Sequence, residues 1–185
     1  ENTLIGGLAG DALTTGSNNV AIGYQALSTE DAHGNNVAVG NRALKTLNAG
    51  AAGINVAVGD DAGLSITTGI YNTLLGGLAG DALTDADHNV AVGFNALSAD
   101  TLGSGSVAIG QGTLNVQNFT TATSTLNTAV GYQAGTSVTS GVHNTLIGGQ
   151  TGDALTQGAR NTAVGVAALT ADTLGQYSTA IGYGA

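Results

Sequence analysis

Acidic residues and histidines are the side chains of this 185-residue sequence whose types and spacing suggest metal or acid–base chemistry. The sequence has 12 acidic residues, three histidines and three Lys or Arg residues, and it has no Cys, Met or Trp. Asp11, Asp81 and Asp153 occupy the same place in three copies of Gly-Asp-Ala-Leu-Thr, so a row of carboxylates could bind a cation. The alternative, an aspartate that accepts backbone N–H groups in a turn, is the favoured interpretation.

Two further acidic stretches, Asp60-Asp61 and Asp85-Ala86-Asp87-His88, could supply oxygen ligands to Ca²⁺. Ca²⁺ takes about six to eight oxygen ligands, and neither stretch matches a known calcium loop. His33, His88 and His143 show no metal-ligand spacing, and the last two are expected to be exposed in turns. We therefore predict no ordered metal and no cofactor, with Ca²⁺ as the weaker alternative.

Catalysis by these residues is not expected. A catalytic triad needs a Ser, a His and an acid in a sheltered pocket, and the sequence contains no nucleophile motif. A rod built from repeats presents shallow grooves rather than a cavity. We predict no catalytic residue and no enzymatic activity.

Aromatic side chains are the remaining candidates for binding. Tyr24, Phe94, Tyr132 and Tyr183 each directly follow a repeated Gly, and such rings can stack on sugars. Covering a neighbouring chain is the favoured alternative for them. Phe119 lies in a polar insertion. Four possible receptor-facing residues are therefore predicted: Phe119, Tyr24, Phe94 and Tyr132.

All these residues belong to a chain built on a five-residue phrase that occurs eleven times. The phrase reads Asn or Ser, then Thr or Val, then Ala or Leu, then Val, Ile or Leu, then Gly. Successive copies are offset by 17 in eight of the ten steps, and by 19 and 21 in the other two. A period this short is typical of a solenoid. Nine copies open with asparagine: Asn2, Asn19, Asn36, Asn55, Asn72, Asn89, Asn127, Asn144 and Asn161. All end with glycine: Gly6, Gly23, Gly40, Gly59, Gly76, Gly93, Gly110, Gly131, Gly148, Gly165 and Gly182.

Every fourth copy of the phrase has a closely similar context. The stretch 2–14 returns almost unchanged at 72–84 and 144–156, which gives a four-coil super-period. We predict one domain over residues 1–185, made of four-coil blocks 1–71, 72–143 and an incomplete 144–185, within a longer polypeptide.

The two long intervals contain insertions at residues 48–53 and 115–125. Insertions in solenoids map to surface loops and are often binding faces. A duplication slip without a binding role is the favoured alternative.

Both faces of the expected strand are apolar or nearly so. Successive side chains of a strand point to opposite faces, so the second and fourth residues of the phrase share one face and the third lies on the other. Strands covered on both sides lack a polar face. One face should therefore line the coil interior and the other should contact a second copy of the chain.

The last residue of the phrase predicts a sharp turn, and the first predicts a column of hydrogen-bonded side chains. Gly reaches positive φ without a steric penalty, so it should turn the chain out of the strand. Three residues later the sequence has Ala in nine copies and Thr in two, which indicates a tight inward position. The opening Asn should stack on its equivalents and pass amide hydrogen bonds along the stack. A helix, a strand and two turns hardly fit into so short a repeat, so we predict an all-β parallel solenoid of eleven coils spanning on the order of 50 Å.

Composition excludes several classes of partner. The net charge is −9 with only 8% charged residues, and phosphate binding needs Lys and Arg, so nucleic acid is not expected. No apolar run approaches the ~20 residues of a membrane span. The 42% hydrophobic content, placed in register, argues against disorder.

Several copies of the phrase resemble repeats of known fibres. Ser106-Val-Ala-Ile-Gly110 resembles the head repeats of trimeric autotransporter adhesins, and Asn127-Thr-Ala-Val-Gly-Tyr-Gln-Ala134 is similar to repeats in bacteriophage-type tail fibres. The resemblance implies a left-handed β-roll in a homotrimer, outside the cell or on a virion. The adhesin heads have a period of about 14, so the additional residues here should enlarge a loop.

The expected function is a structural and adhesive fibre segment, extracellular, at the cell surface or in a virion tail. Its partners would be two further copies of the chain and a glycan or protein receptor. Phage fibre and bacterial adhesin both remain open. A self-stacking filament is the first alternative. An ice-binding solenoid with flat Thr rows is the second.

Overall fold

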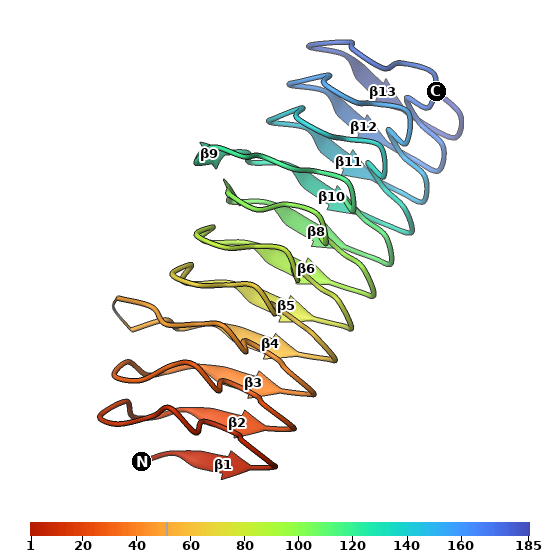
Figure 1. The fold of residues 1–185 in the computed structure, drawn as a ribbon. Helices are drawn as coiled ribbons and strands as arrows, with labels where there is room; N and C mark the ends of the chain where they lie inside the picture. Colours follow the sequence, from red (N-terminus) through yellow and green to blue (C-terminus); the bar gives the residue numbers. More distant parts are fainter. Residues whose placement is uncertain (51) are drawn as a thin grey trace.

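The computed structural model describes residues 1–50 and 52–185, which form a single stack of coils from the N-terminus to the C-terminus (Figure 1). Within these residues the regular structure is all β, without an α-helix. The prediction of an all-β parallel solenoid is confirmed. The described residues include no helix long and apolar enough to cross a membrane.

Each coil contributes one three-residue strand to an eleven-stranded parallel sheet, which forms one wall of the stack (Figure 1). Its strands are β1 (Thr3–Ile5), β2 (Val20–Ile22), β3 (Val37–Val39), β4 (Val56–Val58), β5 (Thr73–Leu75), β6 (Val90–Val92), β8 (Val107–Ile109), β10 (Thr128–Val130), β11 (Thr145–Ile147), β12 (Thr162–Val164) and β13 (Thr179–Ile181). All pairings keep the phrase in register, also across both long intervals. The insertions therefore lie outside the sheet.

A second, two-stranded parallel sheet joins β7 (Gly103–Ser104) to β9 (Thr123–Ser124). It extends the pairing of two adjacent coils where the longer interval begins and ends. Part of the 115–125 insertion is therefore ordered strand.

The coil interior is lined by the third residue of the phrase. Ala38, Leu74 and Leu146 are completely buried, as are nearly all their equivalents, whereas the flanking second and fourth residues are half-buried or exposed. This assigns the two strand faces. The third residue points inward, and the Thr, Val, Ile and Leu side chains on either side of it point outward.

The four coils of each super-repeat, called here the first to fourth coil types in chain order, differ in how their core is packed. In the first coil type a Leu in the strand lies over a Gly in the following turn: a Cβ on Gly80 would be 2.9 Å from a methyl group of Leu74. In the second coil type the strand has Ala91 and the turn has the buried Leu97.

The third coil type keeps the second arrangement, with Leu44 buried in its turn. The fourth has Ala57 in the strand and Gly63 in the turn, and the side chains of Leu44 and Leu74 from the adjacent coils reach that Gly. The narrow interior thus stays filled.

The strand-ending glycines all have φ between 128° and 145°, a region that side chains other than Gly rarely adopt. They also stack closely. A Cβ on Gly40 would lie 2.2 Å from the carbonyl oxygen of Gly59. Conformation and space thus both require Gly here.

The turn after this Gly alternates between left-handed and other backbone conformations, which prevents a helix. In the third coil Arg42 and Leu44 have φ of 54° and 49°. The Arg42 N–H donates to the Tyr24 carbonyl in the preceding coil, at 2.8 Å, and the Leu44 N–H donates to the Ala62 carbonyl in the following coil, at 3.0 Å. Backbone groups are thereby satisfied along the stack axis instead of within a helix.

The asparagine column joins each coil to the next. The Oδ1 atom of each of the nine opening asparagines accepts the backbone N–H of the phrase-opening residue in the following coil at 2.8–3.1 Å. Most of their Nδ2 groups donate to a backbone carbonyl fourteen residues later, such as Ala86 for Asn72. Direct amide-to-amide bonds occur at three steps only, for example from Asn72 to Asn55. The column is therefore mainly a side-chain-to-backbone ladder.

Candidate interaction surface

The outward face of the eleven-stranded sheet runs along the stack from β1 to β13. Its two side-chain columns are the second and fourth residues of the phrase, which are Thr or Val and Val, Ile or Leu. In the middle of the sheet Val58, Leu75, Ile109 and Ile147 are 37–40% exposed. We call these two columns the outer strand face. It contains no charged side chain, and no strand of the described residues packs over it.

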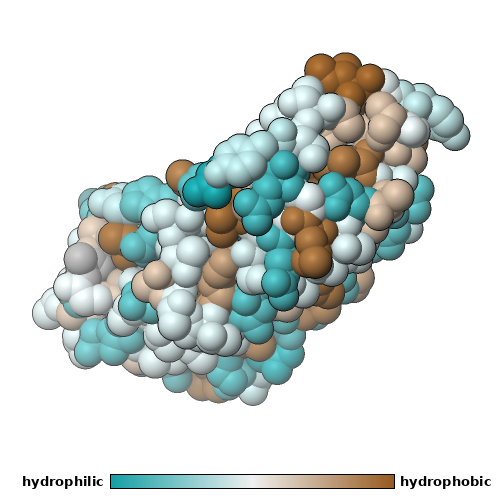
Figure 2. Space-filling view, turned by 90° about the horizontal axis from the view of Figure 1, so that it is seen from above, coloured by the Kyte–Doolittle hydropathy of each residue, from teal (hydrophilic) through white to brown (hydrophobic). Residues whose placement is uncertain are grey.

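Larger side chains stand directly before most copies of the phrase, whereas Gly105 precedes the seventh. From the second copy onward these preceding residues have left-handed φ of 48–79°. The rings of Tyr71 and His88 stack with their centroids 5.0 Å apart, and the Arg160 guanidinium lies 5.5 Å from the centre of the Tyr177 ring. These contacts give the outer strand face a mixed aromatic and polar border. Seen from above, the surface of the molecule shows apolar residues (brown) interspersed with polar ones (teal) (Figure 2).

The aromatic residues that follow the strand-ending glycines are exposed. Tyr24, Phe94 and Tyr132 each have 53–54% of their surface accessible. The rings of Tyr24 and Phe94 lie beside the Gly that occupies the same place in the preceding coil. They sit in the second, sixth and eighth coils, so they are separated by about 10–19 Å at the spacing of stacked strands. They are separate candidate contacts rather than a continuous track.

Phe119 is placed differently from the prediction of a receptor-facing side chain. Only 9% of its surface is exposed, and its N–H donates to Asp100 Oδ1 at 3.0 Å. Gln117 also turns inward and is completely buried. The 115–125 insertion therefore folds two of its side chains into the stack. Polar partners there bind the Gln117 amide, whereas Phe119 is held through its backbone N–H.

That interruption occurs at Ser106, the one non-terminal copy of the phrase that opens without Asn. Gln117 Nε2 donates to Ser106 Oγ at 3.0 Å and to Asp100 Oδ2 at 2.6 Å, and Gln117 Oε1 accepts from Asn127 Nδ2 at 2.8 Å. Gln117 therefore takes over the bridging role of the missing amide. The other insertion, 48–53, includes residue 51, which lies outside the described residues.

The carboxylates of Asp11, Asp81 and Asp153 are not brought together. Four coils separate each from the next, about 19 Å at the spacing of stacked strands, so they cannot share one ion within a chain. Burial raises the pKa of the Asp81 carboxyl, and the neighbouring Asp61 raises it further, while backbone N–H groups lower it. Asp61 is itself paired with Arg42.

Three turn-closing acids were missed by the sequence reasoning: Glu30 and Asp100, which are completely buried, and the half-buried Asp172. They are equivalent positions of the super-repeat, and each accepts the backbone N–H of the residue three positions later, at 3.0, 3.1 and 2.6 Å. An acid that recurs once in every four-coil block was the available signal. Their shared role is to close the turn that precedes the coils opening at Asn36, Ser106 and Ser178.

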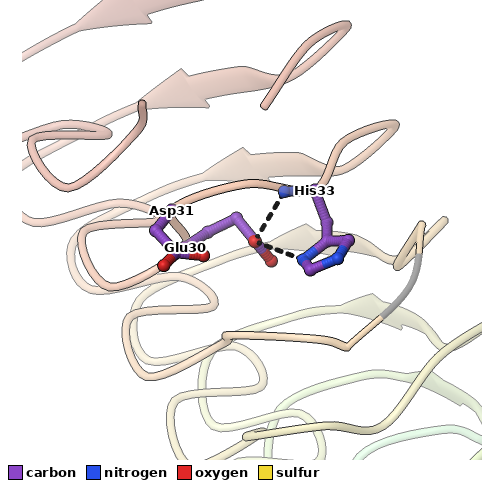
Figure 3. Close-up of side chains that lie close together, drawn as sticks. All are labelled: Glu30, Asp31 and His33. Atoms are coloured by element: carbon purple, nitrogen blue, oxygen red, sulfur yellow. Dashed lines mark hydrogen bonds and ion pairs between the residues drawn. The ribbon is translucent and has the colours of Figure 1, made fainter. Parts of the chain in front are cut away.

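One of these three turns also contains a cluster of metal-ligand side chains. Glu30, Asp31 and His33 each offer one ligand atom, and these atoms lie within 4.8 Å of one another (Figure 3). Among residues 1–50 and 52–185 it is the one such group of three or more. Sequence spacing did not reveal it, since it requires the turn to fold the histidine back onto the glutamate.

Comparison with protein-family models, with curated proteins and with solved structures finds no match to this chain.

Proposed function

We propose that this chain is a segment of a trimeric fibre, extracellular or part of a virion tail, that presents a surface for attachment to a host or cell. The observation that carries the proposal is the outer strand face, an uncharged strip of Val, Ile, Leu and Thr side chains that runs over all eleven strands. Eleven strands spaced ~4.8 Å apart and about 10 Å long give a strip on the order of 500 Å². The largest exposed patch of a protein is often functional when it reaches a few hundred Å².

The occupant that fits this strip is another copy of the same chain. A strip that repeats every coil is matched along its whole length by a partner with the same repeat, and identical subunits associate through closed symmetry. The resemblance to trimeric fibre repeats supports three copies rather than two. With function placed on the outside of the rod, the exposed rings of Tyr24, Phe94 and Tyr132 are the proposed receptor contacts.

The solution mass of the chain tests the assembly. Light scattering coupled to size exclusion should give about three times the 17.9 kDa of one chain. Ile109→Asp places a carboxylate on the outer strand face and should yield monomers, because three buried like charges would meet without partners. Val116→Asp is the matched control, since Val116 is 40% exposed, close to the 38% of Ile109, but lies in the insertion. A monomeric wild-type chain would contradict the proposal, and a ladder of higher masses would favour the self-stacking filament.

Ice binding is the second candidate, and it has one specific observation in its favour. Four consecutive strands, β10 to β13, present Thr in the same outward column: Thr128, Thr145, Thr162 and Thr179. This candidate uses the same face and requires it to be free. A monomer with thermal hysteresis that is lost in Thr145→Val would replace the fibre proposal, whereas a trimer without hysteresis would exclude ice binding. Binding of the trimer to a glycan array, reduced by Tyr132→Ala, tests the attachment role.

A further inference from the structure

The cluster of Glu30, Asp31 and His33 carries an inference that is independent of the proposed assembly. We propose that it binds one divalent transition-metal ion of the zinc class. The ligands would be one imidazole nitrogen and carboxylate oxygens, with water completing the coordination.

The glutamate is already fixed in the geometry of a ligand. Glu30 is completely buried; its Oε1 accepts the His33 N–H at 3.0 Å and its Oε2 accepts the Ala49 N–H at 3.3 Å. Each carboxylate oxygen has a second lone pair, so one remains on each for a metal. Two coils hold this carboxylate in place, because Glu30 and Ala49 belong to successive turns of the stack.

The histidine faces this carboxylate without a hydrogen bond. The Nδ1 atom of His33 is buried and has no hydrogen-bond partner, although it lies 3.4 Å from Glu30 Oε1 (Figure 3). Two ligands of a tetrahedral zinc ion, each bonded at about 2.1 Å, are about 3.4 Å apart. The observed separation is therefore too long for a good hydrogen bond and suits a bridging metal.

The two equivalent turns show that the turn itself does not need Asp31 or His33. There the positions of Asp31 and His33 are taken by Thr101 and Gly103 in one turn and by Thr173 and Gly175 in the other. The turn-closing acid of each still accepts the N–H of the glycine. The backbone carbonyls of Asp31, Thr101 and Thr173 all accept a hydrogen bond from a backbone N–H of the preceding coil, so only the backbone of this position is shared by the three turns. The acidic and imidazole side chains are thus additions specific to one turn.

The ligand set selects the class of ion. An imidazole together with carboxylates suits Zn²⁺, Co²⁺ and Ni²⁺, while Ca²⁺ and Mg²⁺ prefer oxygen alone. Glu30 and His33 belong to one tight turn, so an ion bound to both would hold residues 30–33 together. Because Glu30 also accepts the Ala49 N–H, the ion would strengthen the contact to the following coil.

Isothermal titration of the full chain with ZnCl₂ tests the inference. Wild type should bind one equivalent per chain and show a higher melting temperature with Zn²⁺. His33→Gly and Asp31→Thr, which copy the equivalent turns and so preserve the fold, should each lose about tenfold or more in affinity. His143→Asn, at an exposed turn without acidic neighbours, is the control and should bind like wild type.

Cobalt supplies an independent readout. CoCl₂ added to wild type should give visible absorption bands of a nitrogen- and oxygen-ligated ion, and these bands should be absent in His33→Gly. The inference is overturned by a wild type that binds no Zn²⁺ at millimolar concentration, or by a His33→Gly chain whose affinity and cobalt spectrum equal those of wild type.

Discussion

At the scale of single residues, the strand-ending glycines are constrained by conformation and by space together. Gly148 has φ of 137°, and a Cβ there would lie 2.4 Å from the carbonyl oxygen of Gly165. Its neighbour Gly149 has no such φ, and a Cβ at that position would have its nearest contact 3.9 Å away. Two adjacent glycines therefore differ sharply in what they tolerate.

We expect Gly148→Ala to lower the free energy of unfolding by ~2–4 kcal/mol, because it combines backbone strain with a backbone clash. Gly149→Ala should change it by less than ~1 kcal/mol. Urea unfolding followed by circular dichroism measures both. Equal losses in the two variants would show that the corner conformation is not what requires glycine.

Asp81 is the residue with a pH-dependent prediction. Burial, together with Asp61, raises the pKa of its carboxyl in the folded state, so the ionised form destabilises the fold. This destabilisation is complete above the raised folded pKa, and it disappears as the pH falls below the ordinary aspartate value. Asp81→Asn should therefore raise the melting temperature at pH 7, and the gain should shrink towards zero at about pH 3.

Asp153→Asn is the matched control for this experiment. Asp153 occupies the same place in the super-repeat, but the position of Asp61 in the coil before it is taken by the uncharged Gln133. A smaller gain is expected there. A gain in Asp81→Asn that does not vary with pH would contradict the ionisation argument.

At the scale of the coil, the polar interior depends on a continuous set of hydrogen bonds from one turn to the next. The asparagine ladder provides them at most steps, and Gln117 provides them at Ser106. The insertion before β10 therefore has a structural role. It carries the side chain that closes the gap in the ladder.

Gln117→Ala should cost ~3 kcal/mol or more of unfolding free energy, since it leaves the buried Asp100 Oδ2 and Asn127 Nδ2 each with one partner fewer. The neighbouring Asn118 is exposed and shares one side-chain bond, with Thr101 at 3.1 Å. Asn118→Ala should therefore cost about 1 kcal/mol or less. Chemical denaturation compares the two variants, and a small cost for Gln117→Ala would mean that water replaces it.

At the scale of the whole molecule, the strands of residues 1–50 and 52–185 contact only those of adjacent coils, so stability is close to a sum of coil and interface contributions. The strands pair in sequence order along the sheet, apart from the small sheet of β7 and β9. Blocks of four coils are the natural unit, because the core alternation returns to its starting state after four coils.

Deleting residues 72–143 should leave a folded solenoid. The deletion joins Tyr71 to Asn144, which is the equivalent of Asn72, so the ladder and the core alternation continue across the junction. Deleting residues 72–135 instead breaks the register and should unfold or aggregate. Circular dichroism per residue and melting temperature distinguish the two, and equal behaviour would argue against a register set by the super-repeat.

Much of this architecture could be predicted from the spacing of repeated residues along the sequence. The constant interval between phrases places one strand in each coil, the recurring glycine places the corner, and the small residue three positions later places a buried column, as Ala26 and Ala43 show. These features are local or strictly periodic. Stacking identical coils brings equivalent residues together whatever the exact coil shape.

The sequence by itself determined the period, the strands and their register, because a fixed repeat leaves a parallel stack one way to align. Only the tertiary structure decided which strand face is the core, since both faces are apolar and the direction in which the turn closes selects between them. It also decided that Phe119 is buried and that Glu30, Asp31 and His33 converge. These outcomes depend on where non-repeating turns fold, and neither spacing nor composition specifies that.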